Sequence, residues 1–448
     1  MIILIKVLQL ILCLSILVIL HELGHFLPAK FFKTKVEKFY LFFDPWFSLF
    51  KKKIGETEYG IGWLPLGGYV KIAGMIDESM DKEQLQTEPQ PWEFRSKPAW
   101  QRLIIMLGGV TVNFLLAIFI YAMLLLWKGE YKLPIQKLTM GYAADSLQQA
   151  YGFRTGDIIT GYDNKVKYEE ATNSVFIDIL LDNAKSVQLI RNGKEMSLPV
   201  SEDFYKAALD SKGEYGSFVP AMPAQIDSVM PNSALSKTTA KKGDKLIAVG
   251  GQPIRYFSDA APILKSLKGK ETEILLLRAN DTIAEKVTIS AEGKLGFSPA
   301  DVNGMYSYDT IHYNILSCFP AGAKQAVKML KSYVKQFRII FSSKLKGYKQ
   351  IGGFGRIGSM FPASWDWYAF WKITAFLSVM LAVMNLLPIP ALDGGHVMFT
   401  LYEMVTGRKP GEKFMEYAQV AGMILLFGLM IYANGKDLIE FIMNLLNK

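Results

Sequence analysis

The stretch His21-Glu22-Leu23-Gly24-His25 closes an apolar run that begins at Ile2. On a helix, two histidines four residues apart lie on one face, one turn from each other. That spacing suits two ligands of a tetrahedral zinc ion, with the glutamate between them as general base. Only three polar residues interrupt the run before the motif, Lys6, Gln9 and Ser15. The helix that carries the motif is therefore predicted to lie in a membrane.

Two simpler interpretations of this stretch compete with a metal site. A histidine on an apolar face is often a packed core residue, and the motif can arise by chance. Ionisable groups within a transmembrane segment are costly, however, so three of them in five residues favour a function. The run could also be a signal peptide, but no small-x-small cleavage site follows it, and it leads directly into the motif.

The composition indicates a mixed chain with helices in lipid and folded domains outside it. The 448 residues suffice for two to four compact units, and 50% of them are hydrophobic. Cys13 and Cys318 provide neither a disulfide framework nor a Cys-x-x-Cys metal site. The chain has only four histidines, which excludes a His-rich site. A third zinc ligand is therefore expected to be a distant histidine or a carboxylate.

Three further uncharged stretches are long enough to span a bilayer: Leu103 to Trp127, Ile373 to Leu392 and Tyr417 to Gly435. The loop of residues 28–101 has an excess of lysine and arginine, which places it in the cytoplasm by the positive-inside rule. Four spans then put both termini on one side and the long segment 128–310 outside the cytoplasm.

Within the cytoplasmic loop, the sequence Tyr59 to Ile72 has apolar and aromatic residues on both sides of Gly67-Gly68. This pattern predicts a β-hairpin with the glycines in its turn. The hairpin is either an ordinary exposed one or a sheet edge that reaches toward the active site.

The segment 128–310 contains an internal repeat. Met140 to Ala144 precedes Gly156 to Ile159 in the first copy, and Met230 to Ala234 precedes Gly243 to Ile247 in the second. Each copy continues with a turn, a helical stretch and a β-rich run. The pattern resembles a PDZ domain, more closely in the second copy, and this resemblance implies two modules with peptide-binding grooves. Two β domains of another kind are the alternative.

Two features follow the repeat. Residues 319–346 have a helical period with apolar residues on one side and lysines on another, which favours a helix on the surface of an anionic bilayer over a soluble helix that covers a module. The third span ends in the sequence Asn385 to His396, where Pro388 and Pro390 must break backbone hydrogen bonds. In lipid, such a break is tolerated only beside protein or water, so a polar cavity is expected near Asp393.

Taken together, HELGH at residues 21–25, LPLGGYVKI at 64–72, KPAWQR at 97–102, the paired modules and NLLPIPALDGGH at 385–396 resemble the bacterial site-2 protease family. The resemblance covers nearly the whole chain and implies an intramembrane metalloprotease that uses one Zn²⁺ per chain. It departs from the family at residues 352–358 (GGFGRIG), where relatives tend to have a G-P-I-G pattern.

The resemblance also implies the roles of individual residues. His21, His25 and Asp393 would be the zinc ligands, and Glu22 the catalytic carboxylate. The substrate-binding residues would be Gly67, Gly68 and Tyr69 in a membrane-reentrant β-loop, together with Asn385, Pro388 and Pro390.

The expected fold is a polytopic α-helical membrane protein with four transmembrane helices, a reentrant β-hairpin and two PDZ-like domains. Its segments are predicted as transmembrane helix one (1–27), the cytoplasmic loop (28–101), helix two (102–127), the PDZ-like domains (128–215 and 216–305), the amphipathic helix and linker (306–366), helix three with the LDG motif (367–396), and a loop with helix four (397–448).

The expected partners are transmembrane substrates and the lipid bilayer; no nucleic acid is expected, and the chain is predicted to be monomeric in a bacterial inner membrane. The active site would face the cytoplasmic side and the modules the periplasmic side. Three alternatives remain: a cleaner of remnant signal peptides in place of a signalling protease, a catalytically silent PDZ scaffold, and a transporter with a broken helix.

Overall fold

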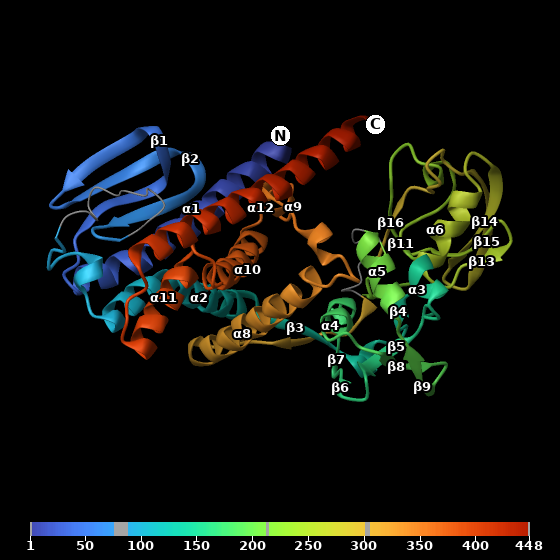
Figure 1. Cartoon of the computed structure of the whole chain (residues 1–448). Helices are drawn as coiled ribbons and strands as arrows, with labels where there is room; N and C mark the ends of the chain where they lie inside the picture. Colours follow the sequence, from blue (N-terminus) through green and yellow to red (C-terminus); the bar gives the residue numbers. More distant parts are fainter. Residues whose placement is uncertain (1, 76–87, 212–214, 301–304, 447–448) are drawn as a thin grey trace. The chain divides into compact units, whose positions relative to one another are not determined.

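The computed structural model describes residues 2–75, 88–211, 215–300 and 305–446 (Figure 1). The chain forms two compact units. Unit one comprises Met1–Gly129, His312–Val334 and Ile351–Lys448, and unit two comprises Glu130–Ile311 and Lys335–Gln350. Residues 212–214 and 301–304, beside the expected domain boundaries at 215 and 305, lie outside the described part, as do residues 76–87 of the cytoplasmic loop.

Unit one is built on four long apolar helices, each long enough to cross a membrane. They are α1 (Ile2–Phe31), α2 (Ala99–Lys128), α10 (Trp367–Asn385) and α12 (Glu412–Leu446). This agrees with the four spans expected from the sequence. The third helix ends at Asn385, before Leu392, because Pro388 and Pro390 cannot continue it. Asp393 begins a separate helix, α11 (Asp393–Thr406).

Helix α2 contacts α1, α10 and α11, so it is the central helix of the unit. Its approach to α1 is close because glycines meet: a Cβ at Gly24 would lie 2.5 Å from the carbonyl oxygen of Gly108. Small residues permit this backbone contact between membrane helices. On its other side, α2 is joined to α11 by an ion pair between Arg102 and Glu403, whose side chains are mostly buried.

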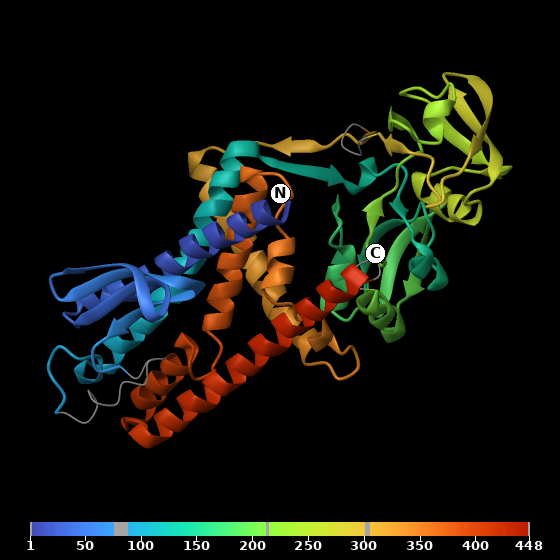
Figure 2. The same cartoon turned by 90° about the horizontal axis from the view of Figure 1, so that it is seen from above.

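Strands β1 (Val36–Ile54) and β2 (Thr57–Ile72) form a sheet that lies against α1 (Figures 1 and 2). The prediction of a tight hairpin turn at Gly67-Gly68 is wrong, because both glycines lie within the continuous strand β2. Leu41 of β1 pairs with Gly68 on one side and with Ile61 on the other, so the two halves of β2 flank β1 and do not pair with each other. Both strands bend, and positive φ angles at Phe42 and Trp46 make the bends in β1. Residues 68–72 therefore form one edge of the sheet.

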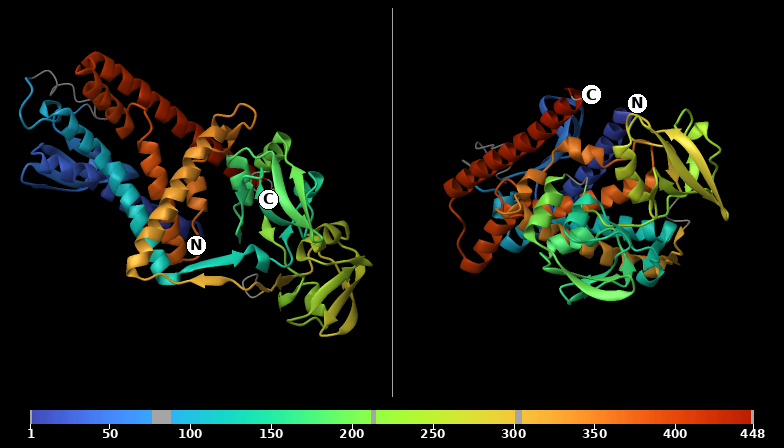
Figure 3. Two further views of the ribbon diagram at one scale, coloured as in Figure 1. Left: turned by 90° about the horizontal axis from the view of Figure 1, so that it is seen from below. Right: turned by 90° about the vertical axis from the view of Figure 1, so that its right-hand side faces the viewer.

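Unit two contains the same four-stranded sheet twice, which agrees with the internal repeat (Figure 3). The first copy has the order β6-β5-β8-β9 and the second β13-β12-β14-β15. Their strands are β5 (Ile158–Tyr162), β6 (Val166–Lys167), β8 (Ser186–Arg191) and β9 (Lys194–Pro199), and β12 (Lys245–Val249), β13 (Gln252–Pro253), β14 (Glu271–Arg278) and β15 (Asp281–Thr288). A helix follows at the equivalent place in each copy, α4 (Val175–Leu181) and α6 (Phe257–Ser266).

An ion pair recurs at the equivalent position of each copy. Arg191 donates two hydrogen bonds to Asp157, and Arg278 donates two to Asp244; in both pairs the residues are 34 positions apart. Hydrogen bonding to Arg278 holds the pKa of Asp244 below its usual range. Each aspartate follows a glycine in the Gly-Asp dipeptide that occurs in both copies of the repeat, so this dipeptide supplies one partner of an ion pair within each module.

The remaining elements are distributed over both units. The described residues of unit two form three further sheets, with the strand orders β17-β3-β7, β10-β4 and β11-β16. The other elements are β3 (Glu130–Pro134), β4 (Tyr142–Ala143), β7 (Glu170–Ala171), β10 (Val219–Pro220), β11 (Ile226–Val229), β16 (Phe297–Pro299), β17 (Asp309–Ile311), α3 (Ser146–Ala150), α5 (Glu202–Asp210), α8 (Ile315–Ile340) and α9 (Phe354–Ser359), with short 3₁₀ turns between them.

Helix α8 is the basic amphipathic helix expected from the sequence. Its first part belongs to unit one, where Gly322 lies against the backbone of α2 at Ala122. Its last part belongs to unit two, where Lys335 pairs with Asp182. Its position on a membrane surface stays a prediction.

Candidate metal centre

Three side chains from two helices converge in unit one. Nε2 of His21 lies 3.2 Å from Oδ2 of Asp393, and Nε2 of His25 lies 3.3 Å from the same oxygen. The two Nε2 atoms are 3.2 Å apart. These three atoms thus form a nearly equilateral triangle, and among the described residues this is the group of three that could hold a metal ion.

The size of this triangle fits zinc. Two ligand atoms about 2.0–2.1 Å from zinc at a tetrahedral angle are about 3.3 Å apart. The donor set of two imidazoles and one carboxylate is that of a catalytic zinc site, which keeps its fourth position open. Oδ2 of Asp393 is buried and makes no hydrogen bond within the described residues. A cation at the centre of the triangle would give this oxygen a partner.

Helix α2 contacts the Nδ1 side of both imidazoles, opposite Asp393. Nδ1 of His25 is 2.8 Å from the backbone carbonyl oxygen of Ile105, and Nδ1 of His21 is 3.2 Å from Nδ2 in the side chain of Asn113. Gly109 lies between these two positions, so Ile105, Gly109 and Asn113 share one face of α2 at intervals of one turn. With Nδ1 of each ring engaged, Nε2 of each ring is directed at Asp393.

The carboxylate of Asp393 is positioned by the broken segment that precedes α11. The backbone N–H of Ala391 donates to Oε1 of Gln419 on α12, at 3.0 Å. Gly422, also on α12, lies against the backbone of Pro390. The segment between the two helices is thus held by side chains and close packing, as a non-helical backbone at membrane depth requires.

Glu22 lies beside the triangle without belonging to it. Its carboxylate faces the backbone of Val70 in the edge strand of the sheet. The same edge contacts α1 one turn earlier, where Gly68 packs on Val18. The glutamate of the motif therefore lies between the candidate metal position and the edge of the sheet.

The other expected site residues differ in their distance from the candidate metal centre. Nδ2 of Asn385 is 3.1 Å from Nε2 of His21, so this residue borders the centre. Pro388 and Pro390 form the broken segment. Tyr69 does not reach the centre: its ring stacks on Tyr40 and its hydroxyl donates to Asp44. Gly67, at the bend of β2, lies against the ring of Phe43.

Sequence reasoning missed the contribution of α2. Neither Gly109 nor Asn113 is among the site residues expected from the sequence. The signal that could have found them is their spacing, because Ile105, Gly109 and Asn113 repeat at the interval of four that also separates His21 from His25.

We expect Gly109→Ala to weaken zinc binding by at least about 10-fold, because outer-shell changes typically have that effect. A Cβ at this position would overlap Nε2 of His25 and Cε1 of His21, so the rings must move. The affinity is measured by competition with a chromophoric chelator. Gly428→Ala is the matched control, since a Cβ there meets no atom within 4 Å. Equal affinity of the two variants would contradict the packing described here.

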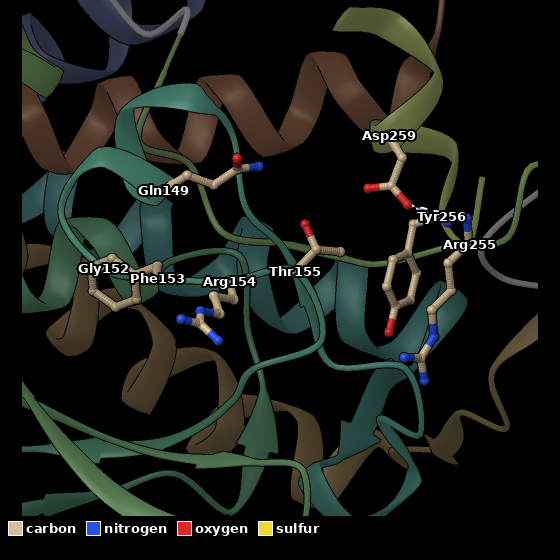
Figure 4. A pocket seen from close by; sticks show the side chains of 8 residues that line it. All are labelled: Gln149, Gly152, Phe153, Arg154, Thr155, Arg255, Tyr256 and Asp259. Atoms are coloured by element: carbon tan, nitrogen blue, oxygen red, sulfur yellow. Dashed lines mark hydrogen bonds between the residues drawn. The ribbon is translucent and has the colours of Figure 1, made fainter. Parts of the chain in front are cut away.

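A cavity of about 470 Å³ lies in unit two and is separate from the metal centre (Figure 4). Its lining comes from both copies of the repeat, with Arg154 from the first and Arg255 and Tyr256 from the second. Asp259 also lines it, but its carboxylate accepts the backbone N–H groups of Arg255 and Tyr256 and so caps α6. The cavity contains none of the candidate ligands.

The sequence matches known proteins over almost its full length. The profile of peptidase family M50 matches residues 9–429. The regulator of sigma-E protease RseP of Escherichia coli is 26% identical, with 94% of this chain and 95% of that protein covered. The RseP of Salmonella typhimurium is also 26% identical, with 94% and 95% covered. A Thermotoga maritima protein provisionally assigned as a zinc metalloprotease is 25% identical, with 96% and 98% covered.

The family match and the geometry agree on the kind of chemistry. The profile extends over both halves of the candidate centre, from before His21 to beyond Asp393. The structure brings these halves together at the spacing of a zinc site. The chain belongs to peptidase family M50 and is a zinc metalloprotease of the RseP-like site-2 type.

Proposed function

We propose that this enzyme cleaves single-span membrane proteins within the bilayer, as one step of regulated intramembrane proteolysis. The observation that carries the proposal is the triangle of His21, His25 and Asp393 on helices that are long and apolar enough to span a membrane. Pre-cut anti-sigma factors and remnant signal peptides are the proposed substrates. A catalytically silent scaffold is not favoured, because the complete ligand set and the family match both indicate an active enzyme.

In this proposal, His21, His25 and Asp393 hold a single zinc ion per chain. When bound, zinc polarises the scissile carbonyl and lowers the pKa of a bound water to about 7. Glu22 takes a proton from the attacking water and delivers it to the leaving amine. The amide of Asn385, 3.1 Å from Nε2 of His21, is close enough to donate a hydrogen bond to the carbonyl oxygen of the scissile peptide.

The substrate must lose helical structure before it can be cut. Each freed backbone group in lipid costs several kcal/mol unless it finds a new partner. Residues 68–72 can supply these partners by strand addition, since within the described residues they pair with another strand on one side only. Val70 in this strand faces Glu22, so a peptide added here would pass the catalytic carboxylate.

Strand addition predicts a pattern of period two in the substrate. A single-span peptide is synthesised with one N-methyl group at successive positions around the cleaved bond. In an added strand, alternate N–H groups point toward the enzyme. We therefore expect methylation at one set of alternate positions to lower turnover by about 10-fold or more, from the loss of one hydrogen bond in a dry site. Methylation at the intervening positions serves as the control, and a uniform effect would contradict strand addition.

The two modules of unit two are proposed to be PDZ-like and to act as a filter at the extracytoplasmic entrance. The repeated sheet and its insertion between the second and third spans support this assignment. The loop of residues 28–101 and the catalytic residues are proposed to lie toward the cytoplasm, from the basic excess of that loop. The enzyme is proposed to be monomeric in the bacterial inner membrane.

The proposal is tested with a panel of single-span substrates in proteoliposomes. The substrates share one membrane sequence and carry outer domains of increasing size. We expect cleavage of the trimmed substrates, progressively slower cleavage as the outer domain grows, and no cleavage by Glu22→Gln. Equal cleavage of bulky and trimmed substrates would rule out the filter. Failure to cleave any membrane-embedded substrate, with zinc present, would rule out the proposed function.

A further inference from the structure

Asn113 is a fully buried amide in the second membrane helix, with an exposed fraction of 0%. Its Nδ2 atom lies 3.2 Å from Nδ1 of His21. Its Oδ1 atom makes no hydrogen bond within the described residues. The backbone of this residue is tied to the third helix, because Ser378 donates to its carbonyl oxygen at 2.6 Å. Independently of that backbone contact, the side-chain amide lies against one imidazole of the metal centre.

The chemistry of zinc binding decides which amide atom must face the ring. A histidine that binds zinc through Nε2 is neutral and carries its proton on Nδ1, so Nδ1 is a donor. An amide nitrogen is also a donor, and two donors 3.2 Å apart make no hydrogen bond. The oxygen and nitrogen of an asparagine amide are assigned from their partners. When the oxygen and nitrogen of the Asn113 amide are exchanged, Oδ1 accepts a hydrogen bond from the N–H at Nδ1 of His21.

The two histidines are then supported in the same way. Nδ1 of His25 faces the carbonyl oxygen of Ile105 at 2.8 Å, a geometry in which the ring can only donate. Both Nδ1 protons would therefore be held by oxygens of α2, and both Nε2 lone pairs would point at Asp393. In metal sites such outer partners fix the tautomer and the orientation of the ring.

We propose that Asn113 is a positioning residue that accepts the Nδ1 proton of His21 and so presents Nε2 to zinc. This inference rests on the proposed zinc centre and adds a residue on a third element to it. Because the amide lies on the opposite side of the ring from Asp393, its role is to orient the ligand and not to bind the metal or the substrate.

The first test compares two substitutions of similar size in the full-length protein in detergent. Asn113→Leu removes the acceptor, and we expect zinc affinity to fall by about 10–100-fold in a chelator competition. Asn113→Asp retains an acceptor, and we expect it to keep the affinity within a few-fold of the original. Ser378→Ala removes the neighbouring hydrogen bond without touching the amide and should bind zinc normally. If Asn113→Leu binds zinc as well as the unaltered protein, or if Asn113→Asp loses as much affinity, the proposal is wrong.

A second measurement is made on the unaltered protein and therefore does not depend on how the Asn113 variants fold. The protein is labelled with ¹⁵N-histidine, and the zinc-loaded form is examined by NMR. We expect the signal of His21, identified by its absence in His21→Ala, to show a protonated Nδ1. A protonated Nε2 would overturn the proposal. Absence of zinc from the unaltered protein would instead overturn the proposed function, so the two failures are distinguishable.

Discussion

Glu22→Gln should abolish nearly all turnover and leave zinc binding intact. A positioned general acid-base residue typically contributes about 10²–10⁴-fold to a rate, and an amide of the same size can neither take a proton from water nor return one to the leaving amine. Zinc should stay bound because Glu22 is not part of the ligand triangle, which comprises His21, His25 and Asp393.

The measurement is the rate of cleavage of a trimmed single-span substrate in proteoliposomes, with zinc content determined on the same samples. Glu56→Gln is the matched control, since Glu56 is an exposed glutamate whose carboxylate lies 4.0 Å from Nζ of Lys30. Loss of zinc from Glu22→Gln would mean that this carboxylate supports the metal itself. Retention of full activity would remove it from the catalytic role.

His21→Ala should lose both zinc and activity. Removal of one of three protein ligands is expected to lower zinc affinity by well over about 100-fold, beyond the effect typical of an outer-shell change. The vacancy would also free Asn113 and Asn385, which both contact this ring. Metal content after dialysis against a weak chelator reports the loss directly, and cleavage of the trimmed substrate reports its consequence.

His312→Ala is the control for the histidine substitution, because His312 is exposed and lies outside the metal centre. Asp393→Ala should reproduce the effect of His21→Ala, since Asp393 completes the same triangle. A full complement of zinc in both His21→Ala and Asp393→Ala would show that the triangle does not bind the metal.

The elements that depend on local pattern could be predicted from the sequence. The length and apolar character of four stretches predicted four membrane helices, and the Gly-Asp dipeptides predicted a repeat that recurs as two sheets of the same strand order. The β-loop was predicted only in part. Strand structure was predicted at residues 59–72, but β1 (Val36–Ile54) was not. The pairing of β1 with β2 depends on bends at Phe42 and Trp46, residues whose positive φ angles no sequence pattern signals.

The sequence by itself determined that His21 and His25 share one helical face, because the period of the helix places side chains four residues apart on the same side. The identity of Asp393 as their partner came from the resemblance of a motif, since spacing carries no information about residues so distant in the chain. Only the tertiary structure decided what surrounds them. The contact of Gly24 with Gly108 sets α2 against the histidines, and this contact places Ile105, Gly109 and Asn113 behind the two rings. Helix packing brings together atoms that local geometry cannot relate, and for that reason the outer support of the metal centre became visible only in the folded chain.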